Sequence, residues 1–153
     1  MLFRSRKPDK IALRLSPDGA SLAWLEPWER RLNLTVQDLA SGETRRVTSA
    51  RERDLGGYAW VSNERLVYVQ DSGGDENYRL YGVGKDGANP IDLTPFDGVK
   101  CDIVDDLEQD DDHVLFQMNR RDPQLFDVYR LNVHDGSMSL AGENPGNIQS
   151  CFT

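Results

Sequence analysis

The sequence has few cysteines and histidines and no long apolar segment. Its 153 residues include two of each, too few for a disulfide framework or a zinc site, so we expect no cofactor and a reducing, cytoplasmic location. No run of about 18 apolar residues is present, which argues against a membrane span. The basic start at 1–7 is followed by no apolar core, so a secretory signal is not predicted.

Basic residues are also in the minority. The chain has 26 acidic and 18 basic residues, a formal net charge of −8. A net negative charge repels phosphate backbones, so nucleic acid is not an expected partner. With 38% hydrophobic and 29% charged residues, the composition is typical of a soluble globular protein and predicts no membrane partner.

Turn-forming residues divide the chain into short runs in which apolar and polar residues alternate. Thirteen glycines and seven prolines are present, and no stretch has a convincing helical period. The first such runs predict strands at 11–15, 21–25, 31–39 and 44–48. The turn at 16–19 has Pro at its second position, which presets φ, and Gly at its fourth. Together these runs predict a four-stranded meander.

This four-stranded unit recurs twice. The later strands are expected at 58–61, 65–69, 78–83 and 90–94, and again at 102–104, 113–117, 127–131 and 137–140. Leu22, Leu66 and Val114 on the second strands are spaced by 44 (66 − 22) and 48 (114 − 66) residues. The glycines of the last hairpins have similar spacings. A period near 45 is typical of β-propeller blades.

We therefore predict an all-β fold, a partial β-propeller that occupies residues 1–153. Three four-stranded antiparallel blades are expected at about 9–49, 56–96 and 100–143. The phase of the repeat predicts the first strand of a fourth blade at 147–153. The length then indicates a portion of a larger ring.

Several motifs carry a family resemblance. In chain order they are Ser16–Gly19, Asp38–Glu43, Asp71–Asn77, Asp92–Phe96, Asn119–Pro123 and Asp127–Arg130. Together they resemble the amino-terminal β-propeller of bacterial prolyl oligopeptidase-family serine peptidases, near the acylaminoacyl and dipeptidyl peptidase branches. The resemblance covers essentially the whole chain.

The resemblance implies a propeller that caps an α/β-hydrolase domain and gates the access of oligopeptides. That domain, which carries the Ser, Asp and His of the family, is the implied partner. A Gly-x-Ser-x-Gly nucleophile elbow is absent here, because the nearest string, at 19–23, lacks the final Gly and falls in a predicted hairpin. We therefore expect this chain alone to be non-catalytic.

Two polar segments at corresponding places in blades 2 and 3 supply the candidate binding or interface residues. These are Asp71, Asp75, Glu76, Asn77, Arg120, Arg121 and Asp122. The first segment is interpreted as a structural loop, as a surface that faces the hydrolase domain or its substrate, or as a calcium site, although its spacing is not that of a dedicated calcium loop. The arginines of the second suit pairing with Asp75 or Glu76 of the previous blade, or binding of a peptide carboxylate. No metal site is predicted.

Three other features have simpler interpretations. The carboxylates between Asp102 and Asp112 are expected to form a solvated turn, with a metal site as the alternative. His113 and His134 are expected to be exposed strand-end residues. The large aromatic side chains are expected in the cores between blades; they are Trp24, Trp28, Trp60, Tyr68, Phe96 and Phe116.

A second function of a different class stays open. Three blades do not close a ring, so strand edges and two blade faces would be left uncovered. The alternative is thus a stand-alone, TolB-like binding or scaffolding module that forms homo-oligomers through these open faces.

Overall fold

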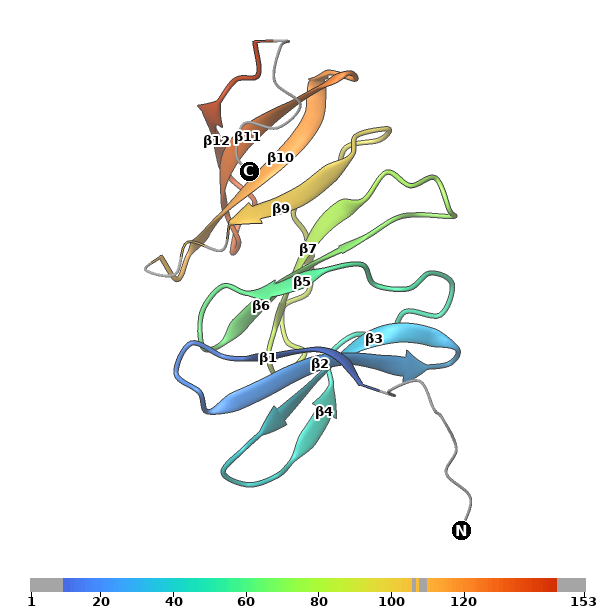
Figure 1. Ribbon diagram of the computed structural model, residues 1–153, viewed down its shortest axis with the longest axis vertical. Helices are drawn as coiled ribbons and strands as arrows, with labels where there is room; N and C mark the ends of the chain where they lie inside the picture. Colours follow the sequence, from blue (N-terminus) through green and yellow to red (C-terminus); the bar gives the residue numbers. More distant parts are fainter. Residues whose placement is uncertain (1–9, 106, 108–109, 146–153) are drawn as a thin grey trace.

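The computed structural model describes residues 10–105, 107 and 110–145. Its strands form three separate four-stranded antiparallel sheets, which follow one another in chain order from the blue to the orange end (Figure 1). The three predicted blades and the all-β fold are confirmed. The strand expected at 147–153 lies outside the described residues. Within the described part of the chain, no helix is long and apolar enough to cross a membrane.

The strand bounds follow the turn residues. Blade 1 contains β1 (Ile11–Leu15), β2 (Ser21–Trp28), β3 (Arg31–Asp38) and β4 (Thr44–Arg46). Blade 2 contains β5 (Tyr58–Trp60), β6 (Arg65–Gln70), β7 (Arg79–Gly84) and β8 (Ile91–Asp92). Blade 3 contains β9 (Cys101–Asp105), β10 (His113–Asp122), β11 (Leu125–Asn132) and β12 (Met138–Gly142). In each blade the strands pair in sequence order, so each sheet is a simple meander.

The turn between β1 and β2 shows how local chemistry fixes these bounds. The Gly19 N–H donates to the Ser16 carbonyl at 2.9 Å, and Gly19 has a φ of +71°, which glycine adopts without strain. The Asp18 carboxylate accepts the Ser16 hydroxyl at 2.6 Å and the Ala20 N–H at 3.0 Å. The Asp18 N–H also donates to Asn63 at 2.8 Å. The turn is therefore anchored to blade 2.

Side-chain alternation along the strands fills two interblade cores. The first interblade core joins blades 1 and 2 through Ala23, Leu25, Leu34, Val36, Val47, Leu55, Tyr58, Trp60, Leu66 and Val83. The second joins blades 2 and 3 through Val61, Val67, Val69, Leu80, Leu93, Val99, Cys101, Val114, Phe116, Met118, Leu131 and Val133. The blades are thus held together by apolar contacts between sheet faces.

The aromatic side chains only partly follow the expectation. Trp60 and Phe116 are buried in the cores, and Tyr68 and Phe96 pack against them.

Trp24 is buried and Trp28 is half-buried, but both lie outside the two cores. Cations cover them instead: the Lys10 ammonium lies 4.5 Å from the Trp24 ring, and the Arg46 guanidinium lies 3.7 Å from the Trp28 ring.

A buried threonine recurs two residues after the last strand of blades 1 and 2. Thr48 accepts the Leu34 N–H and Thr94 accepts the Leu80 N–H, each at 2.9 Å. In both pairs the two residues are 14 positions apart. The hydroxyl extends the pairing between the third and fourth strands beyond the short β4 and β8.

Replacing Thr94 by Val should leave the buried Leu80 N–H without this acceptor. We expect the free energy of unfolding to fall by about 1–3 kcal/mol, the usual cost of a buried donor that loses its partner. Urea unfolding followed by tryptophan fluorescence measures this. Thr94→Ser is the matched control, because it keeps the hydroxyl; an equal loss in both variants would contradict the assigned role.

Candidate functional site

The sequence-predicted site residues lie at one end of the blades. In an antiparallel meander, the hairpin between the second and third strands and the connection to the next blade lie at the same end of the sheet. We call this the loop end. It carries the segments 71–77 and 119–124 and the interblade connections 47–57 and 93–100.

Asp71 has a buried carboxylate at the loop end that is paired with the exposed Arg53. Its carboxylate is 1% exposed and accepts two hydrogen bonds from the Arg53 guanidinium, at 2.9 and 3.2 Å. The Glu76 N–H donates to it as well, at 3.1 Å. The hydrogen bonds from Arg53 hold the pKa of Asp71 below its ordinary value. Asp71 therefore fixes its loop to the connection between blades 1 and 2, and its oxygens are occupied.

The remaining acidic residues of this loop face solvent. The Asp75 carboxylate accepts the Asn77 N–H at 3.0 Å, which closes a local turn. Gly73 and Gly74 have positive φ values, and so does Glu76, at +58°. The Glu76 carboxylate has no hydrogen bond or ion pair within the described chain, and both acids are exposed. Among the described residues no group of three Asp, Glu, His or Cys side chains is arranged to hold a metal ion.

The exposed Arg121 pairs with a second buried carboxylate, within blade 3. Its guanidinium donates to Asp127 at 2.8 and 3.1 Å and to the Asn144 carbonyl at 3.0 Å. Asp127 is fully buried and also accepts the Asn144 N–H at 2.8 Å. The Arg121 hydrogen bonds lower the pKa of Asp127. The expected alternative, pairing of Arg121 with Asp75 or Glu76, is not what the structure has, because β10 continues to Asp122 and carries Arg121 beside β11.

Arg120 and Asp122 flank this pair and have different contacts. The Arg120 guanidinium lies 3.9 Å from the centre of the Phe96 ring, which belongs to the connection between blades 2 and 3. The Asp122 carboxylate accepts the Gln124 N–H at 2.9 Å and closes the hairpin between β10 and β11. Arg120 is exposed and Asp122 is half-buried. Among the residues that the structure describes, no hydrogen bond or ion pair joins this segment to the 71–77 loop.

Two hollows lie at the loop end around Tyr78. The smaller, about 190 Å³, is lined by Arg31, Glu52, Arg53, Asp54, Leu55, Gly56, Asp71 and Tyr78. The larger, about 290 Å³, is lined by Gly56, Gly57, Val69, Tyr78, Lys100, Cys101, Asp102, Gln117 and Phe126. Neither Tyr78 nor Lys100 was predicted as a site residue. Their only signal was their position, Tyr78 at the end of the hairpin before β7 and Lys100 at the end of the connection before β9.

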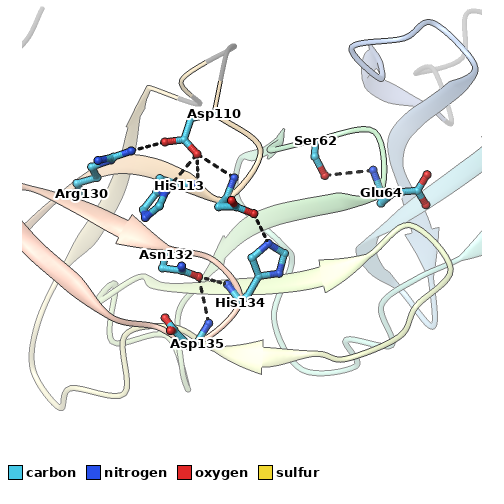
Figure 2. A network of polar contacts seen from close by, with 9 residues as sticks. Ser62, Glu64, Asp110, His113, Arg130, Asn132, His134 and Asp135 are labelled. Carbon is cyan, nitrogen blue, oxygen red and sulfur yellow. Dashed lines mark hydrogen bonds and ion pairs between the residues drawn. The ribbon is translucent and has the colours of Figure 1, made fainter.

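The opposite end of the blades carries the acidic hairpin and both histidines (Figure 2). Asp110 lies between Arg130 and His113, with its Oδ1 3.1 Å from the His113 Nδ1. The His134 Nε2 lies 3.0 Å from Asp112. The Arg130 hydrogen bond, with smaller contributions that include His113, lowers the pKa of Asp110. Each histidine is thus paired with an aspartate, and His113 is half-buried rather than exposed as expected.

Comparison with known proteins places the chain among peptidase propellers. No family model matches the chain. It is 30% identical over 143 residues to dipeptidyl aminopeptidase BIII of Pseudoxanthomonas mexicana. This match covers 92% of this chain and 21% of that protein. It is 25% identical to dipeptidyl peptidase family member 6 of Caenorhabditis elegans, over 94% of this chain and 20% of that protein. The chain therefore spans about a fifth of the length of these relatives.

Solved structures show the same fold. The acylaminoacyl peptidase of Pyrococcus horikoshii matches with a TM-score of 0.62 and 17% identity, over 90% of this chain and 26% of that one. The β-propeller domain of the trilobed protease from Pyrococcus furiosus matches with a TM-score of 0.65 and 16% identity, over 89% and 43%. The repeated blades, the motifs and the sequence relatives together identify the chain as an amino-terminal β-propeller segment of the prolyl oligopeptidase family.

Proposed function

We propose that the chain is the non-catalytic propeller portion of a prolyl oligopeptidase-like serine peptidase. In this proposal the loop end docks an α/β-hydrolase domain and gates the access of oligopeptides to it. The observation that carries the proposal is that the loop end combines fixed loops with exposed charged side chains. Two ion pairs with buried carboxylates, Arg53–Asp71 and Arg121–Asp127, fix its loops, while the charged side chains of Asp75, Glu76 and Arg120 beside them are exposed.

The chemistry of the exposed groups suits peptides. The carboxylates of Asp75 and Glu76 are suited to a peptide amino group or a basic side chain, and the guanidinium of Arg120 to a carboxylate. The larger hollow offers apolar surface from Val69 and Phe126. Rigid loops that carry a few polar groups beside an apolar hollow are typical of surfaces that orient a ligand.

The chain alone is expected to hydrolyse no peptide. The proposal assigns the chemistry to the hydrolase domain, and here the hydrogen-bonding partners found for His113 and His134 are aspartates and not serine. Purified chain should therefore give no turnover of a chromogenic peptide ester. Turnover that co-purifies with the chain and is lost on mutation of a single serine would contradict this assignment.

A chimera tests the role of the loop end. This chain would replace the matched 143 residues of the Pseudoxanthomonas enzyme, and hydrolysis of a dipeptide substrate would be measured. We expect the chimera to retain activity and Glu76→Gln to raise KM by about two- to fivefold, the effect of one solvent-exposed charge contact. Asp111→Asn, an exposed acid at the opposite end, is the control. Equal KM values in all three proteins would contradict a peptide contact at Glu76.

The proposed location is the cytoplasm. Cys101 is a free, buried thiol in the second interblade core. Burial raises its pKa to about 11, so the thiol stays protonated and inert at neutral pH. A free thiol in the core is consistent with a reducing compartment.

A further inference from the structure

One hairpin at the loop end is longer than its counterparts. Eight residues, 71–78, join β6 to β7, whereas two residues join β2 to β3, at 29–30, and two join β10 to β11, at 123–124. Hairpin loops of two residues are common, whereas longer loops more often carry function. The last residue of the long loop, Tyr78, lines both hollows of the loop end.

Contacts with the neighbouring segments hold Tyr78 in place. Its carbonyl accepts the Cys101 N–H at 2.8 Å, which ties the end of the loop to β9 of blade 3. Its ring packs against the second interblade core and lies close to Gly56, where an added Cβ would be 3.6 Å from Cε1 of the ring. The backbone and ring of Tyr78 are therefore positioned by blade 3 and by the connection between blades 1 and 2.

The hydroxyl of Tyr78 does not take part in these contacts. Within the described ranges it has no hydrogen-bond partner, although Tyr78 is half-buried. The Tyr58 hydroxyl, by contrast, donates to the Ala12 carbonyl. A few fixed polar groups in a hollow are what orient a bound ligand. The Tyr78 hydroxyl is thus a positioned hydrogen-bond donor that the fold itself does not use.

We propose that the Tyr78 hydroxyl donates a hydrogen bond to a backbone carbonyl of the oligopeptide that the loop end admits. The acceptor is a neutral carbonyl and not a carboxylate, because Glu52 and Asp54 line the smaller hollow together with Tyr78 and repel an anion. The inference rests on the proposed function and deepens it, since it names the group that holds the gated peptide.

Kinetics of the chimera with the Pseudoxanthomonas enzyme test this contact. Tyr78→Phe removes only the hydroxyl, so KM should rise about three- to tenfold, the effect of one neutral hydrogen bond, while kcat stays unchanged. Tyr129→Phe is the matched control, because Tyr129 is also half-buried and packs against the same core but lines neither hollow. An unchanged KM in Tyr78→Phe, or an equal rise in both variants, would overturn the inference.

The same assay separates the inference from the proposed function. If KM responds to Glu76→Gln but not to Tyr78→Phe, the proposed peptide contact at the loop end stands and the inference alone fails. If KM responds to neither substitution, both fail.

Urea unfolding of the purified chain checks that the effect is not one of stability. Tyr78→Phe should leave the unfolding midpoint unchanged, because its hydroxyl has no partner in the described part of the chain. Tyr58→Phe should lower the midpoint, because it removes the hydrogen bond to Ala12. A fall in Tyr78→Phe as large as that in Tyr58→Phe would show that the Tyr78 hydroxyl serves the fold, which would overturn the inference.

A titration that needs no chimera gives a further measurement. The purified 153-residue chain would be titrated with acetyl-tetraalanine amide and followed by nuclear magnetic resonance, since this probe offers carbonyl acceptors and no carboxylate. Wild type should bind the probe about three- to tenfold more tightly than Tyr78→Phe, and the amides of Gly56 and Tyr78 should shift. Equal affinities of the two proteins, or no binding to either, would overturn the inference.

Discussion

Replacing Phe116 by Ala is expected to lower the free energy of unfolding by about 3–5 kcal/mol, the range for a fully buried aromatic side chain. Phe116 on β10 is fully buried in the second interblade core. Its ring centre lies 5.7 Å from that of Tyr129, in a tilted arrangement. The substitution removes this contact and leaves a cavity between blades 2 and 3, so it weakens their docking as well as blade 3 itself.

Urea unfolding followed by circular dichroism measures this effect, and Leu140→Ala on β12 is its control. Leu140 is 52% exposed, so its truncation should change the free energy of unfolding by less than about 0.5 kcal/mol. If Phe116→Ala were as mild as the control, the second interblade core would not hold the blades together. Separate unfolding of blade 3 in the Phe116 variant would instead locate the weakened interface directly.

The second large effect is expected at Asp127. Asp127→Ala removes the acceptor of two Arg121 hydrogen bonds and of the buried Asn144 N–H. We expect a loss of about 3 kcal/mol at neutral pH, because a charged acceptor disappears and a buried donor is left without a partner. Asp97→Ala is the control: its ion pair with Arg79 involves a fully exposed carboxylate, and its loss should not be measurable.

The loss at Asp127 should depend on pH in a defined direction. The pKa of Asp127 is lowered in the folded chain, so its carboxylate stabilises the fold fully above the unfolded pKa of about 3.9. This contribution is lost as the pH falls through the folded pKa. The difference between wild type and Asp127→Ala should thus be largest near neutral pH and shrink as the pH falls below the unfolded pKa. A difference that stays constant with pH would show that the charge of Asp127 is not what stabilises this site.

The architecture could be predicted from the sequence because it is repetitive. Apolar alternation marks individual strands, and the period near 45 residues relates the blades to one another. The turn at Ser16–Gly19 was also predictable, because Pro and Gly restrict the backbone locally. These features depend on neighbouring residues or on a repeat, and neither requires knowledge of a distant partner.

The roles of the polar site residues could not be predicted in the same way. Asp71 and Arg121 were candidate binding or interface residues, with a structural loop and pairing to Asp75 or Glu76 as the simpler interpretations; in the structure they pair with Arg53 and with Asp127. Residue type does not reveal which of several opposite charges is the partner. For Arg121 the choice depended on where β10 ends, since a shorter strand would have placed its side chain in a loop.

Trp28 and His113 also lie in places that the sequence did not predict, because their contact partners could not be identified from residue type. β2 runs to Trp28, further than the apolar pattern indicated, so Trp28 lies at the loop end under Arg46 and Arg51. His113 was read as exposed, but Asp110 folds back onto it and contacts both its ring and its backbone N–H. The His113 contact arises within the β9–β10 hairpin, whereas the Trp28 contacts come from β4 and the connection to blade 2, which the local sequence around Trp28 does not indicate.

The central claim is that the loop end faces a hydrolase domain, and that the opposite end, which carries Asp110–Asp112 and both histidines, does not. Hydrogen exchange in the chimera with the Pseudoxanthomonas enzyme, compared with the isolated chain, tests it most directly. The account predicts added protection of amides in 71–77 and 122–124, and no change in 110–112 and 134–137. Protection of the acidic segments without protection of 71–77 would contradict it.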